Sequence, residues 1–288
     1  MSATRIAATD VELSLQISGP EDAPVVVLVH GYPDNRSVWD LVVDDLERDH
    51  RVATYDVRGA GESTAPDSRS GYKLGRLVDD LVAVLDRVSP DGRPIHLVGH
   101  DWGSVQLWSA VMHESNDARL RGRLASFTSI SGPGLDQYAH FLRNGLRHRR
   151  FGTVGRQLLH SWYAAVFQLP VVPELVFSRL GGRIRAVLEK RERVNHWEDA
   201  TFRGDARNGL NLYRANRLEF RRSTTAVPVQ LIVPTKDAFI TPAMFEDVET
   251  FAPNLRRLDV VANHWVVQTQ PQMVADAVRA FVKDNEQN

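Results

Sequence analysis

The sequence contains no cysteine among its 288 residues. A disulfide framework, a thiol nucleophile and a cysteine-based zinc site are therefore excluded. No apolar run approaches the roughly 18 residues that a membrane span requires. Residues 1–5 (MSATR) lack the hydrophobic segment of a secretion signal. We therefore expect a cytoplasmic protein.

An excess of charge of one sign is also missing. The chain has 35 Lys and Arg against 36 Asp and Glu, a formal net charge of -1. This balance indicates no steering toward nucleic acid. Neither His-Glu-x-x-His nor a Gly-Lys-Ser/Thr phosphate-binding loop occurs in the sequence. We therefore expect no metal and no organic cofactor.

Strand and helix signals alternate through both ends of the chain. The expected strands are 11–17, 25–29, 51–55, 95–98, 124–130, 229–233 and 255–261. The expected helices are 37–46, 74–88, one from 102 onward, 242–251 and 271–282. The continuous apolar run 25–29 is typical of a strand buried on both faces of a parallel sheet. The pattern predicts an α/β protein with a mostly parallel sheet flanked by helices.

One segment interrupts this alternation. Residues 133–222 are helical and irregular, which predicts a helical lid, or cap, inserted into a core of residues 1–132 and 223–288. The cap contains 16 Arg and one Lys against 8 Asp and Glu, a net charge of +9, so the rest of the chain carries -10. Such a surface is either simply solvated or makes peripheral contact with anionic lipid or an acidic partner. The residues to test first are Arg143, Arg147, Arg149 and Arg150.

Asp101 stands at the centre of Gly99-His100-Asp101-Trp102-Gly103, after a strand signal and before a helix. This is the context of a nucleophile elbow, where glycines two residues away on each side allow the sharp turn. A carboxylate with a pKa of about 3.9 is ionised at neutral pH and needs no base before it attacks. Attack on saturated carbon would give an alkyl ester. The alternative is a capping Asp in an ordinary glycine-flanked turn.

The motif His30-Gly31-Tyr32-Pro33 follows a neighbouring strand, 25–29. In an elbow fold, the oxyanion hole forms from the amide after the nucleophile and an amide of such a loop. The backbone amides of Trp102 and Tyr32 are the candidates. His30 and Pro33 belong to the same candidate binding loop.

Asp237 and His264 each follow one of the last two expected strands. The chain order nucleophile, acid, histidine is that of the α/β-hydrolase triad. His264 is predicted to take a proton from water, and Asp237 to hold its tautomer and stabilise the imidazolium.

These residues, together with the segment 55–63 (YDVRGAGES), resemble the α/β-hydrolase fold epoxide hydrolases over nearly the whole chain. The resemblance implies two cap tyrosines that donate hydrogen bonds to the epoxide oxygen. Tyr163, before Phe167-Gln168, and Tyr213 match their positions. A phenol with a pKa near 10 can stabilise or protonate the alkoxide that ring opening develops. The sequence departs from the family at Asn263, where glycine is usual.

The resemblance also has consequences beyond the site. Its extent is similar to the hydrolase half of some actinobacterial proteins that continue into a short-chain dehydrogenase domain, so a fused or associated domain of that kind is an expectation. The apolar cap stretch 162–177 predicts an apolar, even long-chain epoxide as the small-molecule substrate. The sequence leaves the stereochemistry and the oligomeric state open.

The predicted function is hydrolysis of an apolar epoxide to a vicinal diol through an ester on Asp101. One alternative is a haloalkane dehalogenase with the same triad, in which Trp102 and Trp162 would bind the halide. That reaction would leave the two tyrosines idle. Another alternative is a non-catalytic domain that binds a hydrophobic ligand or partner. Halide release would support the first of these.

Overall fold

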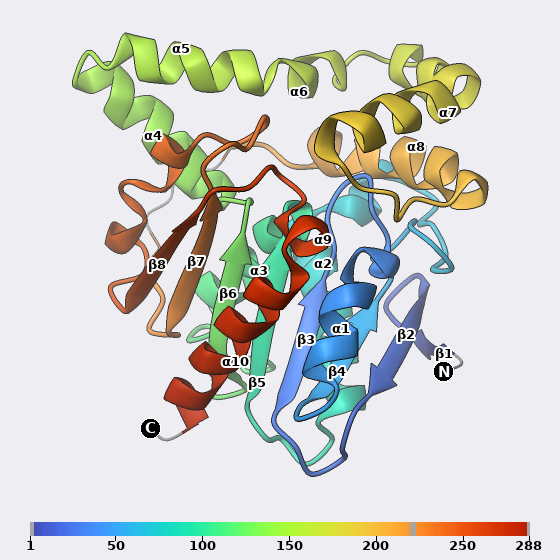
Figure 1. Ribbon diagram of the computed structural model, residues 1–288, viewed down its shortest axis with the longest axis vertical. Helices are drawn as coiled ribbons and strands as arrows, with labels where there is room; N and C mark the ends of the chain where they lie inside the picture. The colour runs from blue at the N-terminus through green and yellow to red at the C-terminus, as the bar shows by residue number, and fades with distance from the viewer. Residues whose placement is uncertain (1–2, 219, 221–222, 287–288) are drawn as a thin grey trace.

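The computed structural model describes residues 3–218, 220 and 223–286. They form an eight-stranded sheet with the order β1-β2-β4-β3-β5-β6-β7-β8, shown in Figure 1. The strands are β1 (Thr4–Ala7), β2 (Glu12–Ser18), β3 (Val25–Val29), β4 (Arg51–Tyr55), β5 (Ile95–His100), β6 (Leu124–Ile130), β7 (Val229–Pro234) and β8 (Leu255–Val260). Only the β1–β2 and β2–β4 pairs of these strands are antiparallel. The predicted α/β class with a mostly parallel sheet is confirmed.

Helices cover both faces of the sheet. Figure 1 shows α1 (Asp40–Leu46), α9 (Val266–Thr269) and α10 (Pro271–Glu286) on one face, and α2 (Leu74–Val88) and α3 (Trp102–His113) on the other. Short 3₁₀ helices, η1 (Arg36–Trp39) and η2 (Arg69–Tyr72), precede α1 and α2. Within the described residues, no helix has the length and apolar character needed to cross a membrane.

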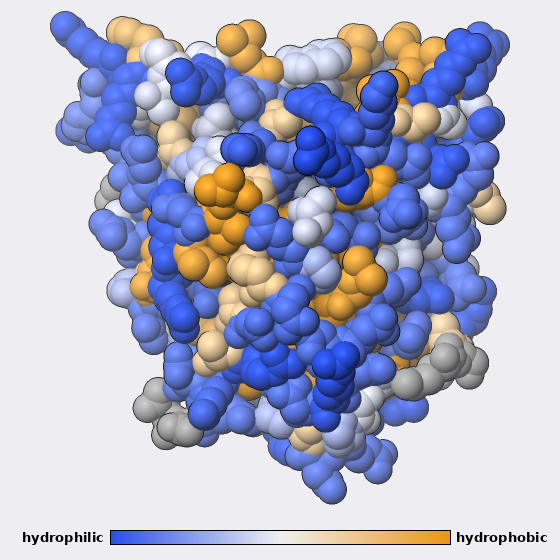
Figure 2. Space-filling model, viewed as in Figure 1, coloured by the Kyte–Doolittle hydropathy of each residue, from blue (hydrophilic) through white to orange (hydrophobic). Residues whose placement is uncertain are grey.

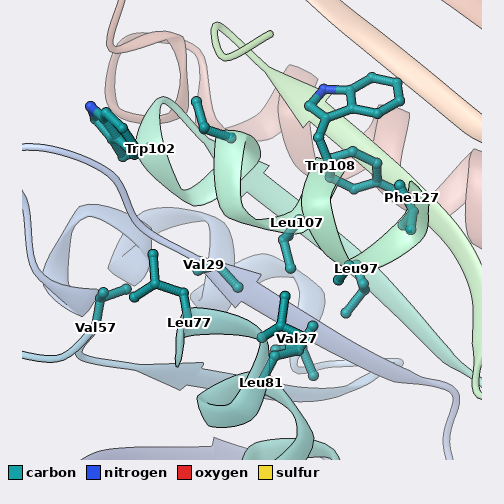
Figure 3. Packing of buried hydrophobic residues seen from close by; sticks show 14 of the residues in the cluster. Val27, Val29, Val57, Leu77, Leu81, Leu97, Trp102, Leu107, Trp108 and Phe127 are labelled. Atoms are coloured by element: carbon teal, nitrogen blue, oxygen red, sulfur yellow. The ribbon is translucent and has the colours of Figure 1, made fainter. Parts of the chain in front are cut away.

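Strand β3 is apolar throughout because both of its faces pack against other elements of the core. Val27 and Val29 of β3 belong to one buried cluster, whereas Val26 and Leu28 belong to the other. This alternation follows from the two-residue period of a strand. Figure 3 shows the first cluster, in which Leu107 of α3 lies over the sheet beside Leu97 and Val27. The core therefore fixes the strand ends from which the site residues project.

The helix expected over 242–251 is not present. The segment forms two 3₁₀ helices, η3 (Pro242–Phe245) and η4 (Val248–Thr250). Phe245, Val248 and Phe251 are all buried. Their spacing of three residues places them on one face of a 3₁₀ helix as readily as on an α-helix. The apolar periodicity is therefore compatible with either structure.

The segment between β6 and β7 forms the cap. Its helices are α4 (Leu135–Arg147), α5 (Phe151–His160), α6 (Trp162–Val166), α7 (Val172–Glu192) and α8 (Asp199–Ala215). Figure 1 shows them above the carboxyl ends of the parallel strands, the end of an α/β sheet where ligands bind. The domain limits predicted at 133 and 222 stay a prediction, and residues 219, 221 and 222 lie outside the described residues.

Asp205 of α8 joins the cap to the core. Its carboxylate accepts hydrogen bonds from the backbone N–H of Gly61 (2.9 Å) and the side-chain amide of Asn35 (3.1 Å). Burial raises the pKa of Asp205 to about 6, although these hydrogen bonds act in the opposite direction. A carboxyl group at this contact therefore binds a proton more tightly in the folded chain than in the unfolded chain.

Because the folded pKa of Asp205 exceeds the unfolded one, its contribution to stability is present below pH 4 and is lost as the pH rises through 6. We expect the free energy of unfolding of the native chain, relative to an Asp205→Asn variant, to fall by on the order of 3 kcal/mol across this range. Urea denaturation of both chains at several pH values measures the difference. A difference that does not change with pH would contradict the prediction.

Candidate active site

Asp101 lies in the sharp turn between β5 and α3. Its backbone has φ 51° and ψ -123°, a conformation that residues with a side chain rarely adopt. The turn is held because the Asp101 N–H donates to the carbonyl of Ile130 (3.0 Å) and its own carbonyl accepts from Val105 N–H (3.0 Å). A Cβ on Gly103 would lie 2.0 Å from the carbonyl oxygen of Val29. Glycine at this position is therefore what lets α3 start so close to β3.

The loop after β3 reaches the Asp101 carboxylate. The backbone N–H of Tyr32 donates to Asp101 Oδ1 at 2.8 Å. A Cβ on Gly31 would lie only 2.5 Å from the same oxygen, so glycine permits this approach. Trp102 is the first residue of α3, where a backbone amide has no partner within the helix. The two amides expected to form an oxyanion hole thus flank Asp101.

His264 lies between two carboxylates. Its Nδ1 is 2.8 Å from Asp237 Oδ2, and its Nε2 is 3.5 Å from Asp101 Oδ2. The other oxygen of Asp237 accepts hydrogen bonds from the backbone N–H groups of Phe239 (2.7 Å) and Ile240 (3.0 Å). The structure therefore brings together the three residues that the sequence places 163 positions apart, from 101 to 264.

The charges of this group favour an ion pair. Burial alone would lower the pKa of His264, but the Asp237 and Asp101 carboxylates raise it well above its ordinary value. Burial alone would raise the pKa of Asp237, but His264 and the backbone N–H donors lower it. In the resting site, His264 is thus an imidazolium held by two carboxylates.

Two tyrosines face Asp101 from the cap. Tyr163 comes from α6 and Tyr213 from α8, and their ring centroids are 6.1 Å apart. Burial, and then neighbouring groups that include Asp101, raise the pKa of both phenols. A hydrogen bond from the Trp102 side chain reaches Tyr213. Both phenols therefore keep their protons at neutral pH and are able to donate them.

The site opens into a cavity of about 560 Å³. Asp101, His264, Tyr163 and Tyr213 lie in its wall, and most of the remaining lining is apolar. The apolar lining includes Val166, Phe167, Val172, Val176, Phe177 and Phe239. A pocket of this size and lining, with a carboxylate in its wall, fits a small, mainly apolar organic ligand.

Residues 24–271 match the model of the alpha/beta hydrolase fold family. This chain belongs to the α/β hydrolase fold family. The strained turn at Asp101, the adjoining amide of Tyr32 and the buried His264–Asp237 pair lie together in one site of this fold.

Several curated proteins are similar to this α/β hydrolase. The probable oxidoreductase EphD of Mycobacterium tuberculosis is 35% identical, over 94% of this chain and 48% of its own length. Epoxide hydrolase 3 of Xenopus tropicalis is 28% identical, over 93% of this chain and 74% of its own length. The chain thus spans about half the length of the mycobacterial relatives that it matches.

Solved structures share the fold. The epoxide hydrolase of Bacillus megaterium superposes with a TM-score of 0.77 at 20% identity, over 97% of this chain and all of that one. The epoxide hydrolase VrEH1 of Vigna radiata gives the same TM-score at 20% identity, over 98% of both chains. These likenesses show that the α/β hydrolase fold is common to all three chains.

His30 and Pro33 were both expected to line the binding site of this α/β hydrolase, but only Pro33 does so. Pro33 lines the cavity beside Tyr32. His30 does not, because its ring serves the backbone: Nε2 accepts from the Val57 N–H (2.8 Å), and Nδ1 donates to the Gly31 carbonyl (2.9 Å). Burial lowers the pKa of His30, so the ring stays neutral. His30 positions the Tyr32 loop and lies apart from the cavity.

Next to this loop lies a buried carboxylate, Asp34, for which the sequence pattern gives no signal. Asp34 accepts hydrogen bonds from His196 Nε2 (2.8 Å) and Trp197 Nε1 (2.6 Å) of the cap, and from Trp265 Nε1 (2.9 Å) next to His264. Burial acts to raise its pKa, but these donors and nearby charges lower the pKa of Asp34 to about 2. Asp34 is a permanent anion that joins the cap, the Tyr32 loop and the His264 loop.

Glu192 at the end of α7 is a second such residue. It is buried, and its Oε2 has no hydrogen-bond partner within the described part of the chain. Burial raises the pKa of Glu192, whereas the charge and backbone N–H of His264 act to lower it. The cap therefore places a further carboxyl group beside His264, and no local motif in the sequence signals it.

Proposed function

We propose that this chain is an epoxide hydrolase that converts an apolar epoxide to a vicinal diol. The observation that carries the proposal is the meeting of one carboxylate nucleophile, Asp101, and two protonated phenols, Tyr163 and Tyr213, in the wall of one apolar cavity. Ring opening of an epoxide needs both a nucleophile for carbon and a proton donor for oxygen. The named epoxide hydrolases among the relatives support the same reaction.

In the first step, Asp101 attacks a ring carbon while the phenols of Tyr163 and Tyr213 hydrogen-bond to the epoxide oxygen. Oδ1 is held by the Tyr32 amide, so Oδ2 is the oxygen that forms the bond to carbon. The carbon–oxygen bond of the ring breaks, and the alkoxide takes a proton from a tyrosine. The product is an alkyl ester on Asp101.

In the second step, water attacks the Asp101 carboxyl carbon and its proton goes to His264. Ester formation removes the negative charge of Asp101, which had raised the pKa of His264. The imidazolium therefore gives its proton to the tyrosinate that the first step leaves, and the neutral imidazole, oriented by Asp237, serves as the base. The amides of Tyr32 and Trp102 stabilise the oxyanion. The diol leaves with the proton that His264 took from water, and the regenerated Asp101 carboxyl group gives its proton to His264, which restores the resting carboxylate and imidazolium.

The rival functions fit this site less well. A dehalogenase would need Trp102 and Trp162 as halide donors. The Trp102 side chain is hydrogen-bonded to Tyr213, and Trp162 is 64% exposed. A purely binding domain gives no reason for the ordered His264–Asp237 pair beside Asp101.

The test is product analysis by mass spectrometry. The purified chain is incubated with aromatic and long-chain epoxides, and in parallel with haloalkanes. We expect vicinal diols from the epoxides, with higher kcat/KM for the apolar members of the panel. Halide release without diol formation would assign the dehalogenase function. No product from either panel would favour the binding domain.

Replacing one cap tyrosine by phenylalanine is expected to reduce kcat/KM for epoxides by about 10²-fold, because a donor to the developing alkoxide is lost. Replacing both Tyr163 and Tyr213 should reduce it by about 10³-fold or more. Steady-state kinetics measure the effect. The matched control is Tyr138→Phe, since Tyr138 lies in the cap and hydrogen-bonds to Ser161 and Gln157. An equal loss in all three single variants would contradict the assigned roles.

Two expectations of the sequence analysis stay predictions. The relatives of about twice this length carry an oxidoreductase name, and we propose that a short-chain dehydrogenase domain accompanies hydrolase domains of this type. Affinity capture from the source organism, followed by mass spectrometry of intact chains, tests that association. A cytoplasmic location is the second expectation, and cell fractionation tests it.

A further inference from the structure

Exposed apolar side chains are concentrated in one part of the cap. Of the 17 large hydrophobic residues exposed in the described chain, 13 lie between residues 146 and 187, in α4 to α7. Figure 2 shows apolar side chains along the upper edge of the molecule, over these helices. Concentrated exposed apolar surface of this kind marks a site of interaction.

A slightly wider segment, residues 137–188, is strongly cationic. Residues 137–188 contain eight Arg, no Lys and a single acidic residue, Glu174. Glu174 is itself paired with Arg214. Six of the eight arginines are exposed and form no ion pair within the described residues. These are Arg143, Arg147, Arg149, Arg156, Arg179 and Arg183.

Helix α7 shows how the two properties combine. Val176, Arg179, Leu180, Arg183 and Val187 are exposed and, apart from the adjacent pair Arg179 and Leu180, recur at intervals of three or four residues, so they share one face of the helix. The opposite face is buried through Phe177 and Gly181. A face of Val and Leu interleaved with Arg suits a lipid interface, because the long arginine side chain reaches the headgroups while its neighbours enter the acyl region.

The entrance to the cavity lies in this surface. Leu159, Trp162, Val166 and Val172 line the cavity and are also exposed, Leu159 by 75%. Their side chains therefore form a rim that leads from the outer surface of the cap toward Asp101. An apolar molecule that left a lipid layer at this rim would reach the cavity without crossing water.

We propose that residues 146–187, the apolar–cationic surface of the cap, dock on an anionic lipid bilayer, and that the substrate enters the cavity from it. The docking part of this proposal depends only on the apolar–cationic surface. The entry of an epoxide from the bilayer also rests on the proposed function. Charge favours a bilayer over a second copy of the chain. A symmetric dimer through this surface would bring its arginines together, while anionic lipid neutralises them.

Vesicle flotation tests the docking. Vesicles of phosphatidylcholine, with and without phosphatidylglycerol, are mixed with the native chain and with variants. We expect the native chain to float with the anionic vesicles only. The double variant Arg179→Gln/Arg183→Gln should bind them about thirtyfold more weakly. Leu180→Ser/Val187→Ser should also lose binding. The matched control, Leu41→Ser/Arg87→Gln, changes exposed residues of α1 and α2 and should bind like the native chain.

A second assay separates docking from catalysis. None of the substituted residues lines the cavity, so all variants should hydrolyse a small water-soluble epoxide at the native rate. On a long-chain epoxide carried in anionic vesicles, the two surface variants should be slower, in proportion to their lost binding. Vesicle binding without turnover of any epoxide would overturn the proposed function and leave docking in place.

Three results would overturn the docking itself. They are no flotation of the native chain, equal flotation with both kinds of vesicle, and equal flotation of the surface variants and the control. Sedimentation velocity tests the alternative that a second copy of the chain covers this surface. A dimer that Leu180→Ser/Val187→Ser dissociates would assign the apolar–cationic surface to a second copy of the chain.

Discussion

Replacing Asp101 by alanine is expected to abolish diol formation, with a loss of about 10⁴-fold or more in kcat. The carboxylate supplies the bond to the substrate carbon, and no other carboxylate lines the cavity within the described residues. The two phenols and the apolar lining of the cavity can still bind the epoxide, so KM should change far less than kcat. Product mass spectrometry and steady-state kinetics measure both quantities.

The matched control for this variant is Asp34→Asn, which alters a buried carboxylate near the site that does not line the cavity. It should lower stability, because its donors lose a charged acceptor, while the folded fraction retains diol formation. Diol production by Asp101→Ala at the native rate would exclude the ester mechanism. Water would then have to attack the epoxide directly.

Replacing His264 by glutamine is expected to stop the reaction at the ester. The first step needs only Asp101 and the tyrosines, whereas the second needs a base next to the ester carbonyl. Turnover should fall by about 10⁴-fold. Intact-protein mass spectrometry should show the chain heavier by the mass of one epoxide, and peptide mapping should place the added mass on Asp101. The native chain, quenched under the same conditions, should show far less of this adduct.

The variant Asp237→Asn is the companion to this experiment. It removes the charge that orients His264 and stabilises the imidazolium, while keeping the side-chain shape. The adduct should accumulate here too, with a smaller loss of turnover. No adduct in either variant, together with lost turnover, would show that His264 is needed before the ester forms.

The parts of the site that the sequence predicts are those with local causes. Gly99 and Gly103 bracket Asp101 because backbone atoms of neighbouring elements approach both glycines closely. This need for glycine on both sides of Asp101 can be seen in the five consecutive residues 99–103 (GHDWG). The strand end that precedes Tyr32 is likewise marked by the apolar run 25–29, which stops at a turn. The two cap tyrosines have no such local cause, and only the resemblance to a family indicates them.

The parts that the sequence does not predict depend on distant contacts. Asp34 and its donor His196 are 162 residues apart, and neither lies in a recognisable motif. The helix predicted over 242–251 is wrong because its apolar spacing suits two kinds of helix, and the contact of Asp247 with Asn144 of α4 (2.7 Å) is not visible in the segment itself. Strand β1 (Thr4–Ala7) has four residues, mostly exposed, which is too little apolar signal to read.

The hydrogen bonds to Asp34 hold the cap on the core, and this limits the ways in which the substrate range of the protein can change. Lifting the cap would take His196 and Trp197 from a buried anion, a costly separation. We therefore expect the cap to stay in place through the catalytic cycle. Ligands would then pass an entrance of constant width and be selected there by size. A new substrate specificity would then arise by substitution of the entrance residues Leu159, Trp162 and Val172, without any change to the reacting residues deeper in the cavity.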